Sequence, residues 1–389
     1  MYALIDSNNN TYDNVIVPLT QHSPLLLRAV LALSANHLKP RNPNYLTVAL
    51  DYRGSVLAAL FHALNHQPHS LSKTEIVASV LMLCFCDLPD DRQGDWRKHF
   101  YGVRQLINLP SQQLFTSTDN ALLSYLGQYF APRVILAYSA LDNPANEAKM
   151  VEAASFWLTK IDRPEREINC VSGCSTELVR VIFDIVQQVR RWLRYPDQRT
   201  EIRAWKEATE HTLRTIRQLV PATTTSASNT ANATADEERQ SAERAKRAEQ
   251  MAEAYRLAAV ILLQYLEDDV WQRSSTVKAC VRSILDLMEV IDKPGEHAKT
   301  CSIWPWFIAS CHASSDAERL HVLRKYAFLV DEDWYGNTLP VAQVLAEKTW
   351  LKHDMDGYCG AAGARERPGS GFFPWEEALM GLGMDFTWS

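Results

Sequence analysis

A group of histidines near the end of one predicted helix could support metal chemistry. His62 and His66 are four residues apart, which places both imidazoles on one face of a helix, and His69 follows them. Zinc sites often use imidazole nitrogens that converge from one side. No further metal-binding side chain stands nearby in the sequence, and histidines at the carboxyl end of a helix also suit its dipole. We therefore predict neither a metal site nor a cofactor.

Residues for nucleophilic catalysis are present but poorly arranged. A serine–histidine–aspartate triad could be assembled on paper from Ser172, His99 and Asp95, but the sequence around Ser172 lacks the strand-to-helix elbow that exposes such a serine. Cys170 and Cys174 are separated by three residues, whereas redox and zinc motifs use two. Neither a phosphate-binding loop nor a dinucleotide glycine pattern occurs. We predict no catalytic or binding residues and a protein that is not an enzyme.

The composition indicates a protein with a large core and no general affinity for polyanions. The 389 residues suffice for several average domains or one large helical domain, and 47% of them are hydrophobic. A net charge of −6 gives no attraction to nucleic acid or anionic membranes. The amino-terminal residues do not resemble a signal peptide, and no apolar run reaches membrane-spanning length. Most cysteines lie within apolar helical patterns, which is typical of an intracellular, reducing environment.

The stretch from Ile76 to Ile107 is expected to lie at the centre of the fold. It opens with an eleven-residue run, Ile76 to Cys86, that is apolar at almost every position. A helix that is apolar on every side must be surrounded by other helices. A turn over Asp87 to Gly94 and a second helix from Asp95 to Ile107 would complete a helical hairpin.

Capping residues and helical periodicity predict the remaining elements. Ser72 and Glu75 have the spacing of a capping box, and Ser23 followed by Pro24 is a favourable helix start. Pro132 is expected to bend or break the helix that contains it. The predicted helices are Pro24–Leu38, Tyr45–Leu64, Thr118–Leu141, Pro144–Ile161, Ser175–Trp192, Arg199–Leu219, Asp236–Leu266, Val277–Ile291, Cys301–Ala313, Ala317–Leu329, Thr338–Leu351 and Trp375–Leu382.

No alternating strand pattern occurs, so we predict an all-α fold, an orthogonal or superhelical array of many helices. Residues 221–235 (PATTTSASNTANATA) are too poor in large apolar side chains to offset their ordering entropy, so we expect a disordered loop there. The predicted organisation is an irregular lead-in over residues 1–22, an N-terminal helical half over 23–220, this loop, and a C-terminal half of the same domain over 236–389.

Several blocks of the sequence resemble the fungal-specific transcription factor domain, the effector region of zinc-cluster regulators. The similarity is to the branch that includes sterol-responsive regulators, and it covers the chain from about Ser23 onward. The blocks are SPLLLRAVLALSANHL (23–38), ALDYRGSVLAAL (49–60), VLMLCFCDL (80–88) with the Trp96-Arg97-Lys98-His99 helix, IWPWFIASCHA (303–313), the segment 344–354 ending in TWLKHD, and PWEEALMGLGM (374–384).

This resemblance implies an all-helical regulatory domain that acts in the nucleus, with DNA read by a separate six-cysteine, two-zinc cluster. No cysteine pair here has the two-residue and six-residue gaps of that cluster, and no basic segment accompanies one. Either the chain is a fragment or isoform without an N-terminal reader, or the protein never had one. We therefore expect no specific DNA binding by these residues.

The expected partners are the transcription machinery or co-regulators, with a small apolar effector as a further ligand suggested by the sterol-responsive members. Because regulators of this type often read paired half-sites, we also consider a homodimer formed through apolar helix faces. The alternatives are a helical scaffold without a transcriptional role and, less favoured, a metal-dependent or hydrolytic enzyme. Some side chains could line an apolar pocket or simply fill the core, so none is predicted as a binding residue: Met82, Cys86, Phe100, Trp304, Trp306 and Phe307.

The carboxyl-terminal segment, Trp375 to Ser389, allows two interpretations. Acids interleaved with large apolar residues are typical of activation segments, and the glycine-rich stretch Gly357 to Gly371 would let this segment detach. Trp375, Leu379 and Leu382, however, fall on one helical face. We favour a helix docked on the core, because burying each large side chain contributes about 1.5–3 kcal/mol.

Overall fold

The chain is described by a computed structural model over residues 12–39, 42–66, 71–87, 101–103, 105, 117–140, 144–169, 172–221, 235–267, 274–291, 303–331, 338–359 and 372–382. In these ranges the regular structure is helical, and the only β pairing consists of two isolated bridges, Glu167–Leu219 and Ile168–Ser175. The predicted all-α class is confirmed.

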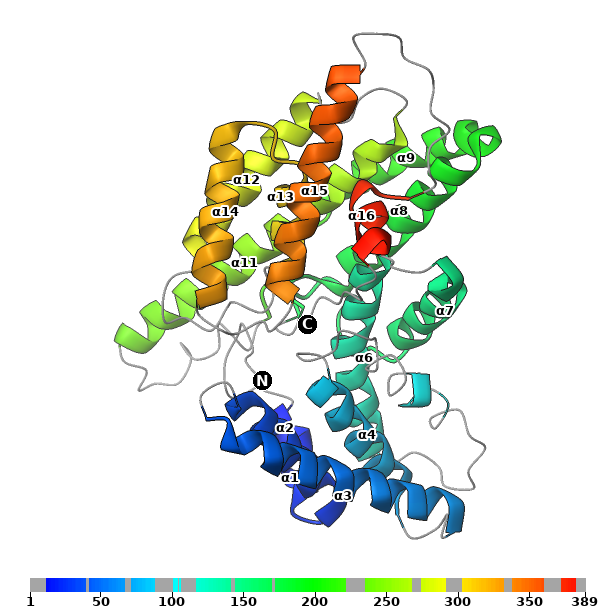
Figure 1. Cartoon of the computed structure of the whole chain (residues 1–389), viewed down its shortest axis with the longest axis vertical. Helices are drawn as coiled ribbons and strands as arrows, with labels where there is room; N and C mark the ends of the chain where they lie inside the picture. Colours follow the sequence, from blue (N-terminus) through cyan, green and yellow to red (C-terminus); the bar gives the residue numbers. More distant parts are fainter. Residues whose placement is uncertain are drawn as a thin grey trace.

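Figure 1 shows the first helices at one end of the molecule and the later ones at the other, with α6 running between them. The first group comprises the π-helix η2 (Tyr12–Ile16), α1 (Val17–Thr20), α2 (Pro24–Leu38), α3 (Asn44–His66) and α4 (Lys73–Asp87). After α6 (Ser117–Tyr138) come η3 (Pro144–Asn146), α7 (Glu147–Leu158), α8 (Thr176–Arg194), η4 (Pro196–Gln198), α9 (Arg199–Thr215), α11 (Ala235–Leu263), η6 (Gln264–Leu266), α12 (Ser275–Ile291), α13 (Ile303–Cys311), α14 (Asp316–Asp331), α15 (Thr338–Cys359) and α16 (Pro374–Leu382).

Helix α4 is buried on every side, as its apolar run predicts. Every residue from Ile76 to Cys86 is buried. The capping box is formed: the Ser72 amide donates to Glu75 Oε2 at 2.9 Å, and the Glu75 amide donates to Ser72 Oγ at 3.2 Å. The second half of the predicted hairpin lies mostly outside the described residues, although residues 101–103 and 105 are helical.

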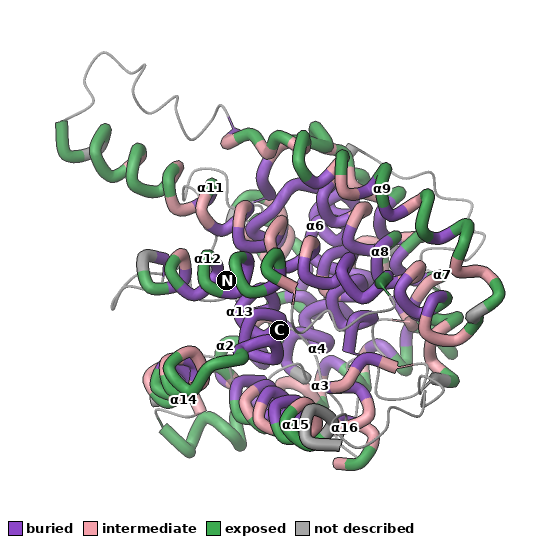
Figure 2. The backbone as a smooth tube through the Cα atoms, turned by 90° about the horizontal axis from the view of Figure 1, so that it is seen from above, coloured by how far each residue is buried: buried purple, intermediate pink, exposed green. Residues whose placement is uncertain are grey.

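The core draws on both halves of the chain. Buried apolar side chains from α2 through α16 belong to one connected cluster. Figure 2 shows these buried residues along the inner helices α6, α8 and α13, with exposed residues on the outer helices and at the start of α11. Every residue of α13, Ile303–Cys311, is buried. Such a helix, like α4, is held by neighbours on all sides rather than by one apolar stripe.

Helices α6 and α7 approach each other closely at a glycine. A Cβ atom placed on Gly127 would lie 2.9 Å from the backbone oxygen of Trp157 and 3.1 Å from the backbone nitrogen of Ile161. Any side chain at this position would therefore force the two backbones apart. Gly54 in α3, by contrast, has no atom within 4 Å of such a Cβ.

Several features of the helices differ from the sequence prediction. Residues 12–20 of the predicted lead-in are helical. Helix α6 continues through Pro132, so a break there is wrong. Helix α9 ends at Thr215, before the predicted Leu219. Helix α15 extends through Cys359, which places Gly357 in a helix rather than in a loose stretch.

Of the predicted disordered loop, residues 221–235, only the first and last residues are described. Residue 221 is buried coil and Ala235 already starts α11, while residues 222–234 lie outside the described ranges. No single helix in the described part is long and apolar enough to span a membrane; Asn14–Thr20 and Pro24–Leu38 meet that criterion only as a pair bent by 118°.

Candidate functional site

The histidines singled out for metal chemistry do not form a site in the described part of the chain. His62 lies on the exposed side of α3, whereas the side chain of His66 and all of His69 fall outside the described residues. Among the residues that the structure describes, no three His, Cys, Asp or Glu side chains are grouped so that they could hold a metal ion.

The serine of the hypothetical triad has a structural hydrogen bond. Ser172 is buried, and its hydroxyl donates to the backbone oxygen of Cys174 at 3.1 Å within the turn before α8. Cys174 is also buried, with 1% of its surface exposed. Asp95, His99 and Cys170 lie outside the described residues. The described part of the triad therefore contributes to a turn and does not present a nucleophile.

The side chains considered for an apolar pocket lie in the core. Trp304, Trp306 and Phe307 of α13 and Met82 and Cys86 of α4 are all at most 5% exposed. Phe100 lies outside the described residues. None of these residues was predicted as a binding residue, and the burial of the described ones is that of ordinary core packing.

A buried ion pair joins α8 to the carboxyl-terminal helix α16. Arg190 Nη2 contacts Glu376 Oε1, and the two side chains are only 2% and 0% exposed. The same Arg190 nitrogen donates to the backbone oxygen of Tyr138 at 2.7 Å. The backbone amide of Phe373 donates to Glu376 Oε2 at 3.0 Å. Both carboxylate oxygens of Glu376 thus accept hydrogen bonds inside the core, as a buried charge requires.

The guanidinium of Arg190 is enclosed by aromatic rings. Its central carbon lies 4.6 Å from the ring centre of Tyr138 and 5.8 Å from that of Phe373. Its Nε and Nη1 atoms are buried without a hydrogen-bond partner among the described residues. The single carboxylate of Glu376 is therefore the main compensation for this buried charge, which makes the pair sensitive to any change in either partner.

Ser139, at the end of α6, receives hydrogen bonds from two tryptophans. The indole nitrogen of Trp375 donates to its backbone oxygen at 2.8 Å, and that of Trp304 donates to its hydroxyl at 2.9 Å. Trp375 also stacks on Phe373, with ring centres 4.7 Å apart. The start of α16 is therefore fixed by an ion pair, an indole hydrogen bond and ring stacking.

The polar cluster continues from Tyr138 toward the surface. The hydroxyl of Tyr138 donates to Glu147 Oε1 at 2.8 Å, and Glu147 also pairs with Arg194. Burial raises the pKa of Tyr138, so its hydroxyl keeps its proton and remains a donor. Burial also acts to raise the pKa of Glu147, but hydrogen bonds from Arg194 and Tyr138 outweigh it, and the pKa lies below its ordinary value.

A second buried polar pair lies beside Trp375. His312 Nδ1 lies 2.6 Å from the backbone oxygen of Ile308, so this nitrogen carries the proton. The other nitrogen, Nε2, is 3.0 Å from the hydroxyl of Tyr265 and accepts its hydrogen bond. Burial lowers the pKa of His312 to about 3 and raises that of Tyr265 well above its ordinary value. Both groups are neutral at physiological pH and serve the packing around α16.

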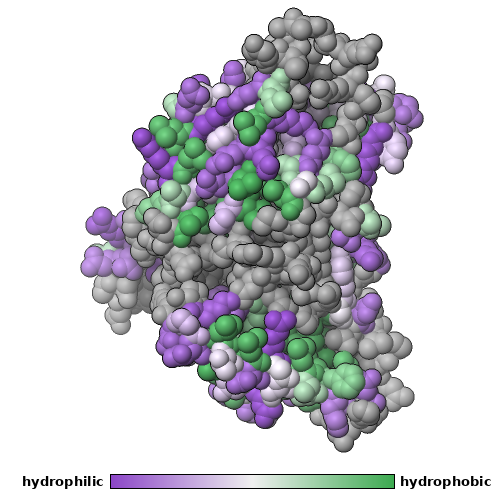
Figure 3. Space-filling view, in the orientation of Figure 1, coloured by the Kyte–Doolittle hydropathy of each residue, from purple (hydrophilic) through white to green (hydrophobic). Residues whose placement is uncertain are grey.

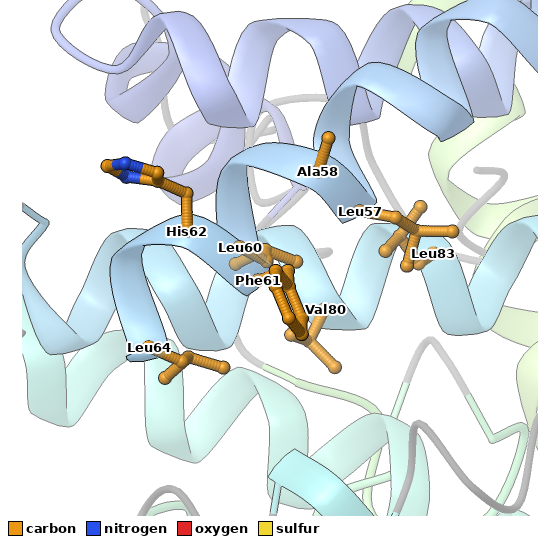
Figure 4. Close-up of a pocket in the computed structure, with 8 residues that line it drawn as sticks. All are labelled: Leu57, Ala58, Leu60, Phe61, His62, Leu64, Val80 and Leu83. Carbon is orange, nitrogen blue, oxygen red and sulfur yellow. The ribbon is translucent and has the colours of Figure 1, made fainter. Parts of the chain in front are cut away.

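An apolar groove lies between α3 and α4 in the described part of the chain. Its volume is about 700 Å³, and it is lined by Leu57, Ala58, Leu60, Phe61, His62, Leu64, Val80 and Leu83. Figure 4 shows Leu60 and Phe61 of α3 meeting Val80 of α4, while His62 and Ala58 point away from them. Figure 3 shows hydrophobic residues gathered at the end of the molecule where Figure 1 places α3. This groove carries no polar group arranged for chemistry and suits an apolar contact.

Sequence reasoning missed the Arg190–Glu376 pair, although one signal was available. Arg190 falls on the apolar stripe of α8, four residues after Val186 and eight after Ile182. A charged residue on a buried stripe requires a buried partner. Nothing in the sequence, however, indicates which carboxylate supplies it, because Glu376 is 186 residues away.

The comparison with protein-family models settles the class of the chain. The model of the fungal specific transcription factor domain matches residues 1–388. The chain belongs to this family. Neither a curated protein nor a solved structure shows significant similarity to the chain.

Membership of the fungal specific transcription factor domain family is consistent with the geometry described above. Transcription factor domains are typically non-enzymatic and act in transcription regulation, in general within the nucleus. The buried polar groups described above hold helices together, and the groove between α3 and α4 is apolar.

Proposed function

We propose that this chain is the regulatory, or effector, domain of a fungal zinc-cluster-type transcription regulator and that it controls transcription in the nucleus through contacts with the transcription machinery or co-regulators. The observation that carries this proposal is the match of the fungal specific transcription factor domain to residues 1–388. The described surface adds support, because it includes an apolar groove between α3 and α4 and exposed apolar residues of α3, which suit protein contacts.

In this proposal the chain does not read specific DNA itself. Its net charge of −6 and the absence from its sequence of the six-cysteine zinc-cluster spacing support this. The zinc cluster of such a regulator would reside in a segment other than these residues. A gel-shift assay at physiological salt that found nanomolar, sequence-dependent binding by the chain would contradict this part.

A small apolar effector, as in sterol-responsive regulators, completes the proposal. Its support is the resemblance of the sequence blocks to the family whose members include sterol-responsive regulators. A ligand that binds only the folded state stabilises it by an amount that grows with the logarithm of the ratio of ligand concentration to dissociation constant, and so raises the melting temperature. Sterols or fatty acids added to the purified chain should therefore raise its melting temperature. If none of the compounds tested raises it, the proposal of an apolar effector is contradicted.

The whole proposal is tested by fusing the chain to a foreign DNA-binding module and measuring a reporter gene controlled by that module's site. An effector domain should change reporter output, upward or downward, relative to the module alone. A helical scaffold without a transcriptional role would leave output unchanged.

A further inference from the structure

Helix α3 carries two apolar faces, and only one of them is buried. The buried face consists of Ala49, Val56, Leu60 and Ala63, which are at most 7% exposed. The second face, which we call the α3 seam, consists of Thr47, Leu50, Gly54, Leu57, Phe61 and Leu64. Its large residues are far from buried: Leu50 is 56% exposed, Leu57 40%, Phe61 66% and Leu64 47%.

The α3 seam has the spacing of a coiled-coil interface. Its members alternate at intervals of three and four residues, with Leu50, Leu57 and Leu64 at one heptad position and Thr47, Gly54 and Phe61 at the other. A single-sided globular helix needs only its buried stripe, so a second heptad seam on the exposed side indicates a helical partner. The requirement is a partner helix whose own seam matches these side chains.

A second copy of α3, running antiparallel, meets this requirement. With a two-fold axis between Ser55 and Val56, Thr47 faces Leu64, Gly54 faces Leu57, and Leu50 faces Phe61. Two of these three layers combine a small residue with a leucine. Side chains of the two copies would therefore pack against each other without a large clash or a large cavity. Gly54 has no atom within 4 Å of a Cβ position, which leaves room for the leucine that faces it.

The groove between α3 and α4 extends this complementarity. Leu50 of one copy faces the position where Leu57, Phe61 and Leu64 of the other copy line the groove. A leucine entering a hole made by residues of the facing helix is the packing of coiled coils. The edges of the seam carry two charged residues, Asp51 on one side and Arg53 on the other, so few charged groups would have to lose water when two copies meet.

We infer that the α3 seam is a homodimer interface, formed by antiparallel contact of α3 with α3 of a second copy about a two-fold axis. This inference stands independently of the proposed function, because its evidence is the spacing and exposure of the seam. A two-fold contact of one patch with itself is the commonest way in which soluble proteins form dimers.

The first test is sedimentation analysis of the whole chain, with variants. The wild-type chain should sediment as a dimer at micromolar concentration. Leu50→Glu should raise the dissociation constant by at least about tenfold, because two carboxylates enter the apolar seam. Leu351→Glu is the matched control: Leu351 is 62% exposed on α15, outside the seam, and the variant should remain dimeric. Melting curves verify that both variants are folded.

The second test determines the direction of the pair. Thr47→Cys and Asn65→Cys copies, when mixed and oxidised, should form a cross-linked heterodimer, because Thr47 of one copy lies beside the end of the seam near Leu64 of the other. Thr47→Cys copies alone should cross-link no more than the wild type, which controls for the native cysteines. A wild-type chain that is monomeric at high micromolar concentration, a Leu50→Glu variant that dimerises as the wild type does, or preferential Thr47→Cys self-linking would each overturn the inference.

Discussion

Arg190 and Glu376 form an ion pair that is almost completely buried and links α8 to α16 across 186 residues of sequence. Because Arg190 has two further buried N–H groups without hydrogen-bond partners among the described residues, Glu376 is its main electrostatic compensation. The docking of α16 is therefore both apolar, through Trp375 and Leu379, and ionic.

Removing the charge of Glu376 should destabilise the fold strongly. Glu376→Gln keeps the shape of the side chain but leaves the guanidinium of Arg190 buried without a counter-charge, which costs about 3–5 kcal/mol in the free energy of unfolding. Urea denaturation followed by circular dichroism measures this loss. Replacing both Arg190 and Glu376 with methionine should recover much of it, because no buried charge is then left.

The neighbouring Glu377 is a matched control for Glu376. Glu377 pairs with Lys352, but the two side chains are 30% and 36% exposed, so solvent already screens their charges. Glu377→Gln should lower the free energy of unfolding by less than about 1 kcal/mol. Equal losses for the two variants would show that Arg190 does not depend on Glu376.

Trp375 should be the main apolar anchor of α16. It is fully buried, stacks on Phe373 and donates a hydrogen bond to Ser139, so Trp375→Ala should cost about 3–5 kcal/mol of the free energy of unfolding. Trp205→Ala, at a half-buried position of α9, removes the same atoms and should cost clearly less.

Deletion of residues 373–389 should lower the melting temperature. Lost reporter activation at unchanged stability would instead support a free activation segment.

The close approach of α6 and α7 predicts an asymmetry between two glycines. Gly127→Ala places a methyl group 2.9 Å from the backbone oxygen of Trp157 and should cost about 1–3 kcal/mol in the free energy of unfolding. Gly381→Ala in α16 meets no atom within 4 Å and should cause no loss, with a gain of up to about 1 kcal/mol from helix propensity. If Gly127→Ala unfolds at the same urea concentration as the wild type, the two helices do not approach as described.

His312 should make the fold less stable in acid. Its pKa is about 3 in the folded chain because of burial and about 6.5 in the unfolded chain, so the unfolded state binds the extra proton between these values. The stability due to the neutral imidazole is complete above pH 6.5 and falls by up to about 1.4 kcal/mol per pH unit as the pH drops toward 3.

Comparison of the wild type with His312→Gln isolates this contribution from the titration of carboxylates. The difference in free energy of unfolding between the two proteins should shrink as the pH is lowered from 7.5 to 5. A difference that stays constant over this range would mean that His312 is not a neutral, buried hydrogen-bond acceptor for Tyr265.

The parts of the fold that depend on neighbouring residues were predictable. The Ser72–Glu75 capping box, the fully buried α4 and the docked face of α16 each follow from spacing within one turn or one helix. Relationships between distant segments were not: helical periodicity cannot pair Arg190 with Glu376, nor show that Gly127, rather than Gly54, lies at a close helix contact. The break considered at Pro132 is wrong, because α6 continues through this proline within a buried helix.

The sequence predicted the functional class of the chain but not the surface features that could serve this function. Family resemblance indicated a transcription factor domain, and the family match confirms it. The exposed seam of α3 was not predicted, because periodicity alone cannot distinguish a second, solvent-exposed apolar face from the face that packs on the core. The exposure of Leu50 and Phe61 in the structure separates the two faces.

Reporter output of the tethered chain is the most direct test of the central claim that this chain is a transcriptional effector domain. The wild-type chain fused to a foreign DNA-binding module should change reporter expression several-fold relative to the module alone, while Glu376→Gln, which weakens the fold, should reduce that change at equal protein level. Output identical to that of the module alone, from a fusion shown to be folded and nuclear, would contradict the claim.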